Sequence, residues 1–103
     1  MNLDEQAQDL DEAISDRATE RWFRAVAEEA GEVVGAFNKM DYAGEKHRTP
    51  DDVLEEAGQL LGCMIVCMQR LGFSWDQLQV SASEFMASKA AQIRALRSGK
   101  GDV

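Results

Sequence analysis

The chain is short of the residues and patterns that interrupt helices. Proline occurs once, at Pro50, among 103 residues, and no alternation of β-branched residues is sustained anywhere. Because proline marks breaks and β-branched alternation marks strands, their scarcity predicts an all-α fold. A chain of this length has room for one hydrophobic core. We therefore expect a single domain over residues 1–103.

Cysteine and basic residues are also scarce. The two cysteines, Cys63 and Cys67, are too few for a four-thiolate metal site or a disulfide scaffold, and they predict buried free thiols in a reducing, cytoplasmic setting. The 19 acidic residues outnumber the 11 basic ones, and the formal charge of −8 disfavours nucleic acid and anionic membranes as partners. No signal-peptide pattern opens the chain. The strongly apolar run at 60–68 is shorter than the roughly 20 residues that a membrane span needs.

Apolar residues spaced three and four apart divide the chain into four amphipathic segments. The predicted helices cover residues 1–16, 18–40, 50–71 and 75–97, followed by a flexible tail at 98–103. Thr49 and Ser74 are predicted N-caps, and Gly72 is predicted to close the third helix. That helix is apolar around nearly its whole circumference. Four short helices cannot readily enclose it, so we expect a second subunit to cover its remaining face.

Two of these helices carry carboxylates on their apolar sides. At about 100° per residue, Glu29 lies near the centre of the second helix's apolar stripe and Glu32 at its edge, whereas Glu28 points away. On the third helix, Glu56 lies near the centre of the stripe and Gln59 near its edge. Antiparallel packing of the two helices would join these side chains in one oxygen-rich patch. Such a patch needs a cation, and Mg²⁺ takes these ligands together with substrate phosphates.

A charge of the opposite sign lies on the fourth helix. Lys89 falls near the middle of the stripe formed by Leu78, Phe85 and Leu96. An inward lysine could neutralise a buried carboxylate as a structural partner, or it could reach the phosphates of a bound nucleotide. Spacing alone leaves both roles open.

The order Glu29-x-x-Glu32, a gap of 23 residues, then Glu56-x-x-Gln59 resembles the MazG-like nucleoside triphosphate pyrophosphohydrolases. The family pattern is ExxE, a variable connection and ExxD on the next long helix. The segments AEEAGEVVGAF and LEEAGQLLGCMIVCMQRLGF agree with its helical context, and the similarity covers about residues 20–97. The resemblance implies a four-helix MazG-like bundle completed by oligomerisation to a homodimer or homotetramer. It implies conversion of an NTP or dNTP to the monophosphate and pyrophosphate.

The resemblance also assigns roles to residues. It implies that Glu29, Glu32 and Glu56 are catalytic and ligate Mg²⁺, for which Mn²⁺ could substitute, with Gln59 as a further ligand. The family has Asp where this chain has Gln59, and a neutral amide weakens a Mg²⁺ site. The alternative function is therefore a catalytically weakened or inactive MazG-like binding or regulatory module. Asp52, one turn before Glu56, could supply the missing carboxylate.

Four further residues are candidates for substrate binding: Lys89, Lys39, Asn38 and Trp22. Trp22 could stack on a base, but it lies on an apolar stripe, which favours core packing. Asn38 and Lys39 follow the acidic motif and could touch sugar or phosphate, or be solvated. The basic triplet at 46–48 could approach a triphosphate, although loop charges are usually solvated. A phosphoribosyl-ATP pyrophosphohydrolase ranks lower, because the third helix lacks the histidine expected of that relative.

Overall fold

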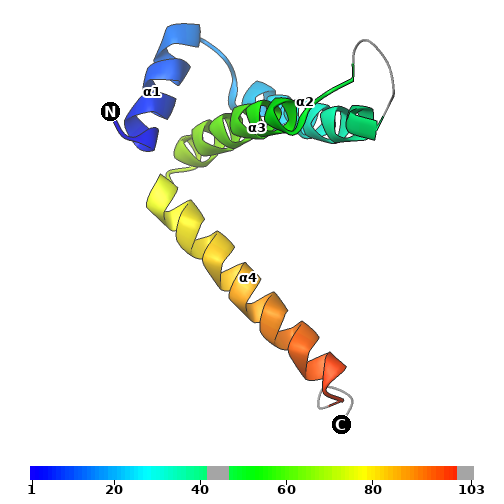
Figure 1. Cartoon of the computed structure of the whole chain (residues 1–103). Coiled ribbons are helices and arrows are strands. Elements are labelled where there is room, and N and C mark those ends of the chain that lie inside the picture. Colours follow the sequence, from blue (N-terminus) through cyan, green and yellow to red (C-terminus); the bar gives the residue numbers. More distant parts are fainter. Residues whose placement is uncertain (42–46, 100–103) are drawn as a thin grey trace.

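The computed structural model describes residues 1–41 and 47–99, and these ranges contain helices and turns but no strand (Figure 1). The helices are α1 (Leu3–Ile14), α2 (Thr19–Asn38), the short 3₁₀ helix η1 (Lys39–Asp41), α3 (Pro50–Arg70) and α4 (Trp75–Arg97). The all-α prediction is confirmed. Among the described residues, no helix combines the length and apolar character needed to cross a bilayer. Most of the predicted tail at 98–103 lies outside the described residues.

The starts of α3 and α4 are fixed by their own side chains. The Thr49 hydroxyl accepts a hydrogen bond from the backbone N–H of Asp52, whose carboxylate accepts from the backbone N–H of Thr49 at 2.7 Å. Ser74 and Gln77 form the same reciprocal pair at the start of α4. Such capping boxes satisfy N–H groups that have no partner within the helix. Both predicted N-caps are confirmed.

The end of α3 follows from one glycine. Gly72 has a φ of +92°, in the left-handed region that glycine enters without a Cβ penalty. Its N–H donates to the carbonyl of Gln69 at 2.9 Å, and the N–H of Phe73 donates to the carbonyl of Met68 at 2.9 Å. These two bonds form a Schellman motif, which closes α3 and turns the chain into α4.

The core lies where α1, α2 and α3 meet. Trp22 of α2 is 1% exposed and packs with Ala7 of α1 and with Ile65, Val66 and Cys67 of α3. Cys67 is a buried free thiol and Cys63 a partly buried one, and burial raises the pKa of both. The tryptophan therefore joins three helices, and its packing holds α2 against α3.

Polar contacts hold α1 in place beside this core. Arg70, near the end of α3, forms an ion pair with Asp11 of α1 at 2.7 Å and donates to the carbonyl of Arg17 at 2.7 Å. The indole N–H of Trp22 also donates to Asp11, at 3.2 Å. At the other end of α1, the Asp4 carboxylate accepts from the backbone N–H of Trp75 at 2.9 Å. α1 thus connects α2, α3 and the first turn of α4.

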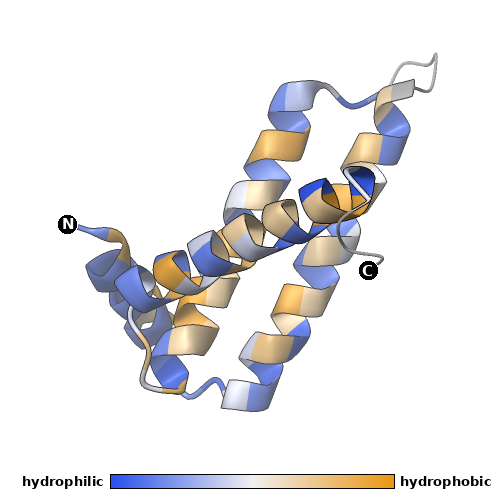
Figure 2. Cartoon of the chain, turned by 90° about the horizontal axis from the view of Figure 1, so that it is seen from below, coloured by the Kyte–Doolittle hydropathy of each residue, from blue (hydrophilic) through white to orange (hydrophobic). Residues whose placement is uncertain are grey.

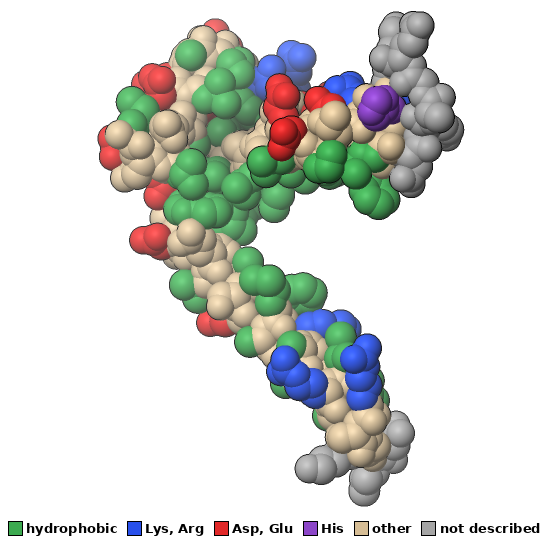
Figure 3. All heavy atoms as spheres, in the orientation of Figure 1, with side chains coloured by type: hydrophobic (Ala, Val, Ile, Leu, Met, Phe, Trp, Pro, Cys, Tyr) green, Lys and Arg blue, Asp and Glu red, His purple; other side chains and the backbone are tan. Residues whose placement is uncertain are grey.

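α4 extends away from the other three helices after its first turns (Figure 1). Hydrophobic residues recur along it, and a row of hydrophobic side chains faces the angle between α3 and α4 (Figures 2 and 3). Five large hydrophobic residues in the middle and distal parts of α4 are exposed. They are Val80, Phe85, Met86, Ile93 and Leu96. The single chain is therefore a three-helix unit with a projecting fourth helix rather than a closed four-helix bundle.

The dimensions of the chain agree with this description. Its radius of gyration is 17.8 Å, against about 13 Å for a compact domain of this length. Its accessible surface is 7783 Å², whereas a compact monomer of 11.4 kDa exposes roughly 5,800 Å². About 2,000 Å² of surface is therefore open in excess of what a compact monomer leaves to solvent.

Candidate metal centre

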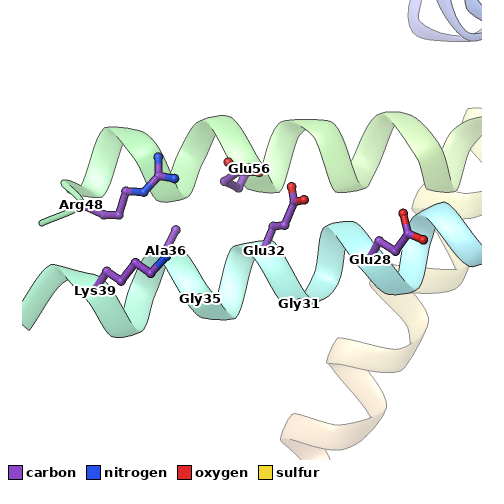
Figure 4. Close-up of a pocket in the computed structure, with 8 residues that line it drawn as sticks. All are labelled: Glu28, Gly31, Glu32, Gly35, Ala36, Lys39, Arg48 and Glu56. Atoms are coloured by element: carbon purple, nitrogen blue, oxygen red, sulfur yellow. The ribbon is translucent and has the colours of Figure 1, made fainter. Parts of the chain in front are cut away.

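α2 and α3 lie side by side and run in opposite directions, joined through the segment at 42–49 (Figure 1). A polar groove of about 450 Å³ runs between them, which we call the α2–α3 groove. Its lining residues are Glu28, Gly31, Glu32, Gly35, Ala36, Lys39, Arg48 and Glu56 (Figure 4). The expected antiparallel packing of the two acidic motifs is thus present.

Three carboxylates converge between the two helices. One oxygen from each of Glu29, Glu32 and Glu56 lies within 4.8 Å of the others. Glu29 and Glu56 are partly buried, and Glu32 is exposed on the groove. The sequence predicts that these three side chains lie close together, and the structure confirms this arrangement.

Two of these oxygens have no partner. Glu29 Oε2 and Glu56 Oε2 are inaccessible to solvent and accept no hydrogen bond from any described residue. A buried carboxylate oxygen without a donor or a counterion is costly. Three carboxylates at this separation also repel one another, and the repulsion is largest where water is excluded. A divalent cation among them would offset both penalties.

The donor set fits a hard cation. All three groups are carboxylates, the ligands that Mg²⁺ and Mn²⁺ prefer, and no thiol or imidazole of the described residues joins the cluster. Glu32 faces the groove, so a cation held there would remain accessible to a ligand in the groove. The residues present therefore fit a metal centre that shares its ion with a bound anion.

The end of the groove near the C-terminus of α2 is positively charged. Figure 4 shows Arg48 and Lys39 at this end, with both side chains extending along the groove towards the glutamates. The backbone N–H of Arg48 donates to the carbonyl of Lys39 at 3.3 Å, which brings the two residues together although they are nine positions apart. The guanidinium of Arg48 approaches Asp52 only to 4.0 Å.

Three other positions near the two motifs lie differently from what the sequence predicts. Gln59 is exposed and is not among the residues that line the groove. Asp52 cannot replace it, because its carboxylate is engaged by Thr49 in the capping box, and these hydrogen bonds lower its pKa. Glu28, expected to point away, lines the end of the groove opposite Arg48 (Figure 4). The apolar stripe of α2 alone does not indicate this position, because a groove between two helices also takes in residues beside the stripe.

The proposed substrate contacts are distributed differently. Lys39 lines the groove, whereas Asn38, its exposed neighbour, does not. Trp22 is 1% exposed, so the core interpretation is confirmed and no ring face is open for a base. Lys89 is exposed on α4, about 21 Å along that helix from Trp75. Within the described chain it does not meet the groove, because α4 projects away from α2 and α3.

Arg48 lines the groove, although loop charges of this kind are usually solvated. The signal was its position immediately before the Thr49 cap. A chain that reverses between two antiparallel helices must bring the residue before the second helix close to the end of the first.

Comparison of the chain with protein-family models, with curated proteins and with solved structures gives no match.

Proposed function

We propose that the chain is a MazG-like, metal-dependent nucleoside triphosphate pyrophosphohydrolase, which converts an NTP or dNTP to the monophosphate and pyrophosphate. The observation that carries the proposal is the pair of buried, unpartnered oxygens of Glu29 and Glu56 beside Glu32. The motif spacing supports it, and so does a groove lined by Glu32 and Glu56 together with two cations.

In this proposal Glu29, Glu32 and Glu56 hold one or more Mg²⁺ ions. Bound Mg²⁺ supplies charge that polarises phosphoryl oxygens and lowers the pKa of bound water. The chain's own contribution is to fix the three carboxylates on two packed helices, so that little reorganisation is needed when a ligand binds. Trp22 acts indirectly, because its packing holds α2 against α3.

A second candidate is a binding or regulatory module that keeps the fold and has little or no turnover. The observation that favours it is the exposed position of Gln59 outside the groove, which leaves three carboxylates and no compensating acid at Asp52. A site with less negative charge holds Mg²⁺ more weakly. Both candidates share the metal centre and differ in catalytic rate.

Pyrophosphate release separates them. Native protein, Glu32→Gln and Glu55→Gln are incubated with a panel of NTPs and dNTPs and Mg²⁺ or Mn²⁺. Glu55 is an exposed neighbour of Glu56 that does not line the groove, so its variant is the matched control. The proposal expects release by native protein and by Glu55→Gln, and a large loss in Glu32→Gln. If native protein releases no more than Glu32→Gln, the catalytic proposal is wrong.

We also propose that the bundle is completed by a second copy of the chain. The exposed hydrophobic residues of α4 and the excess surface of about 2,000 Å² support this proposal. Burying that area on each protomer corresponds to the large, hydrophobic interfaces of obligate homodimers, which bury about 2,000–5,000 Å² in total. Lys89 could approach a groove only in such an assembly, and a tetramer would need a further surface.

A further inference from the structure

We propose that Lys39 and Arg48 form an anion subsite that holds the phosphates of a linear polyphosphate beyond those that contact the metal. The inference rests on the proposed function, because it takes a triphosphate as the ligand of the α2–α3 groove. It adds which part of the ligand the groove recognises, namely the phosphate chain itself.

Groups of opposite charge follow one another along the groove. Glu32 and Glu56 of the carboxylate cluster lie in the middle of the groove, and the two cations lie at the end near η1 (Figure 4). Glu32 and Lys39 are seven residues apart on one helical segment, which corresponds to roughly 10 Å along the axis. An elongated anion with one end at a carboxylate-bound cation would place its other end beside Lys39 and Arg48.

The side chains of Lys39 and Arg48 are both exposed at the end of the groove. The Lys39 side chain is exposed and forms no ion pair with the side chains described at residues 1–40 and 47–99. The Arg48 guanidinium approaches the Asp52 carboxylate at 4.0 Å, and the Arg48 side chain is 43% exposed. The backbone bond between Arg48 and Lys39 holds the two charges on facing sides of the groove. Arginine and lysine bind phosphate by charge-assisted hydrogen bonds, and the guanidinium can do so bidentately.

The groove lining leaves room for a ligand. Between the charged groups it is formed by Gly31, Gly35 and Ala36 of α2, and a Cβ added at either glycine would meet no atom within 4 Å. A phosphate chain would therefore find space and charge in this part of the groove.

The test is calorimetric titration with inorganic tripolyphosphate in the presence of excess Mn²⁺. Native protein is compared with Lys39→Gln, Arg48→Gln and Arg48→Lys. Arg21→Gln is the control, because Arg21 is an exposed cation of α2 that does not line the groove. Circular dichroism confirms that each variant is folded. A nucleoside monophosphate is titrated in parallel, and Mn²⁺ alone is titrated into each variant.

We expect tripolyphosphate to bind native protein, and each glutamine variant to bind it roughly tenfold more weakly. Arg48→Lys should retain more affinity than Arg48→Gln, and Arg21→Gln should match native protein. Mn²⁺ affinity should be unchanged in all of them, and the monophosphate should bind weakly.

Equal tripolyphosphate affinity in native protein and both glutamine variants would overturn the subsite. Absence of tripolyphosphate binding to native protein would also overturn it. Neither result would contradict the proposed function. The proposed function fails instead if the native protein releases pyrophosphate from none of the nucleotides. Conversely, Arg48-dependent binding of tripolyphosphate would uphold the subsite even in a protein without turnover.

Discussion

Glu29 and Glu56 each place one oxygen where neither water nor a described hydrogen-bond donor reaches it. These two oxygens come from different helices, so the cost of leaving them unpaired depends on how closely α2 and α3 pack. A cation would convert that cost into a favourable contact. At the residue scale, the proposed metal centre would therefore also be a contact between helices.

A change at Gln59 tests how the missing fourth carboxylate affects this centre. Gln59→Asp adds a negative charge one helical turn from Glu56. Because affinity for a hard cation rises with ligand charge, we expect this variant to bind Mg²⁺ roughly tenfold more tightly and to release pyrophosphate faster. Titration calorimetry and a pyrophosphate assay measure the two effects. Unchanged affinity and rate would mean that the exposed position of Gln59 keeps it outside the centre.

The ion pair of Asp11 and Arg70 predicts a pH effect on stability. The hydrogen bond from Arg70 lowers the pKa of Asp11 in the folded protein. A carboxyl group with a lowered folded pKa stabilises the fold fully above its unfolded pKa, about 4. That contribution is lost as the pH falls from there through the folded pKa. We therefore expect α1 to loosen on acidification over this range.

Fluorescence of Trp22 measures this loosening, because its indole N–H donates to Asp11. A Trp75→Phe background leaves Trp22 as the single tryptophan. Asp11→Asn should be less stable near neutral pH and should show a smaller change in stability between about pH 6 and the acid range. Asp9→Asn, an exposed change on the same helix, should behave as the parent does. Equal pH dependence in all three proteins would contradict the argument.

At the scale of the elements, the junction between α3 and α4 depends on Gly72. A Cβ at this position would meet no atom within 4 Å, so the cost of substitution comes from its positive φ alone. Gly72→Ala should lower the free energy of unfolding by about 1 kcal/mol. Gly58→Ala, also without a close neighbour but inside α3, should raise it by about 0.5–1 kcal/mol. Urea denaturation measures both, and equal effects of the two variants would be inconsistent with this reasoning.

The helices and their caps were predictable because they depend on residues close in sequence. Thr49, Ser74 and Gly72 act within a few positions of themselves, and each does what its neighbours indicate. The convergence of the two ExxE-like motifs was predictable for a similar reason, since helical phase fixes which side chains face a packing partner. The prediction that Glu29 and Glu56 face each other between the two helices is therefore confirmed.

The features that the sequence did not indicate depend on contacts between distant residues. The direction of α4 follows from Gly72 and from Asp4, whose carboxylate binds the first N–H of α4 from 71 residues away. Lys89 was expected to face inward, yet it is exposed on α4, because helical phase does not tell where a helix points. Glu28 and Arg48 line the groove because of how α2 and α3 pack against each other, which no local pattern encodes.

At the scale of the whole molecule, the projecting α4 predicts self-association. Light scattering at micromolar concentration should give at least twice the chain mass of 11.4 kDa. Phe85→Glu should shift the protein towards the monomer, because it places a charge on an apolar side chain that is 66% exposed in the single chain. Ser83→Glu, about 200° away around α4, should have less effect. A monomeric native protein would contradict the expected assembly.

The metal centre is the central claim, and titration of metal-free protein with Mn²⁺ tests it most directly. The comparison uses native protein, Glu56→Gln and the adjacent control Glu55→Gln. The account predicts that native protein and Glu55→Gln bind Mn²⁺ alike, and that Glu56→Gln binds it at least roughly tenfold more weakly. Absence of Mn²⁺ binding to native protein, or equal affinity in the two variants, would contradict it.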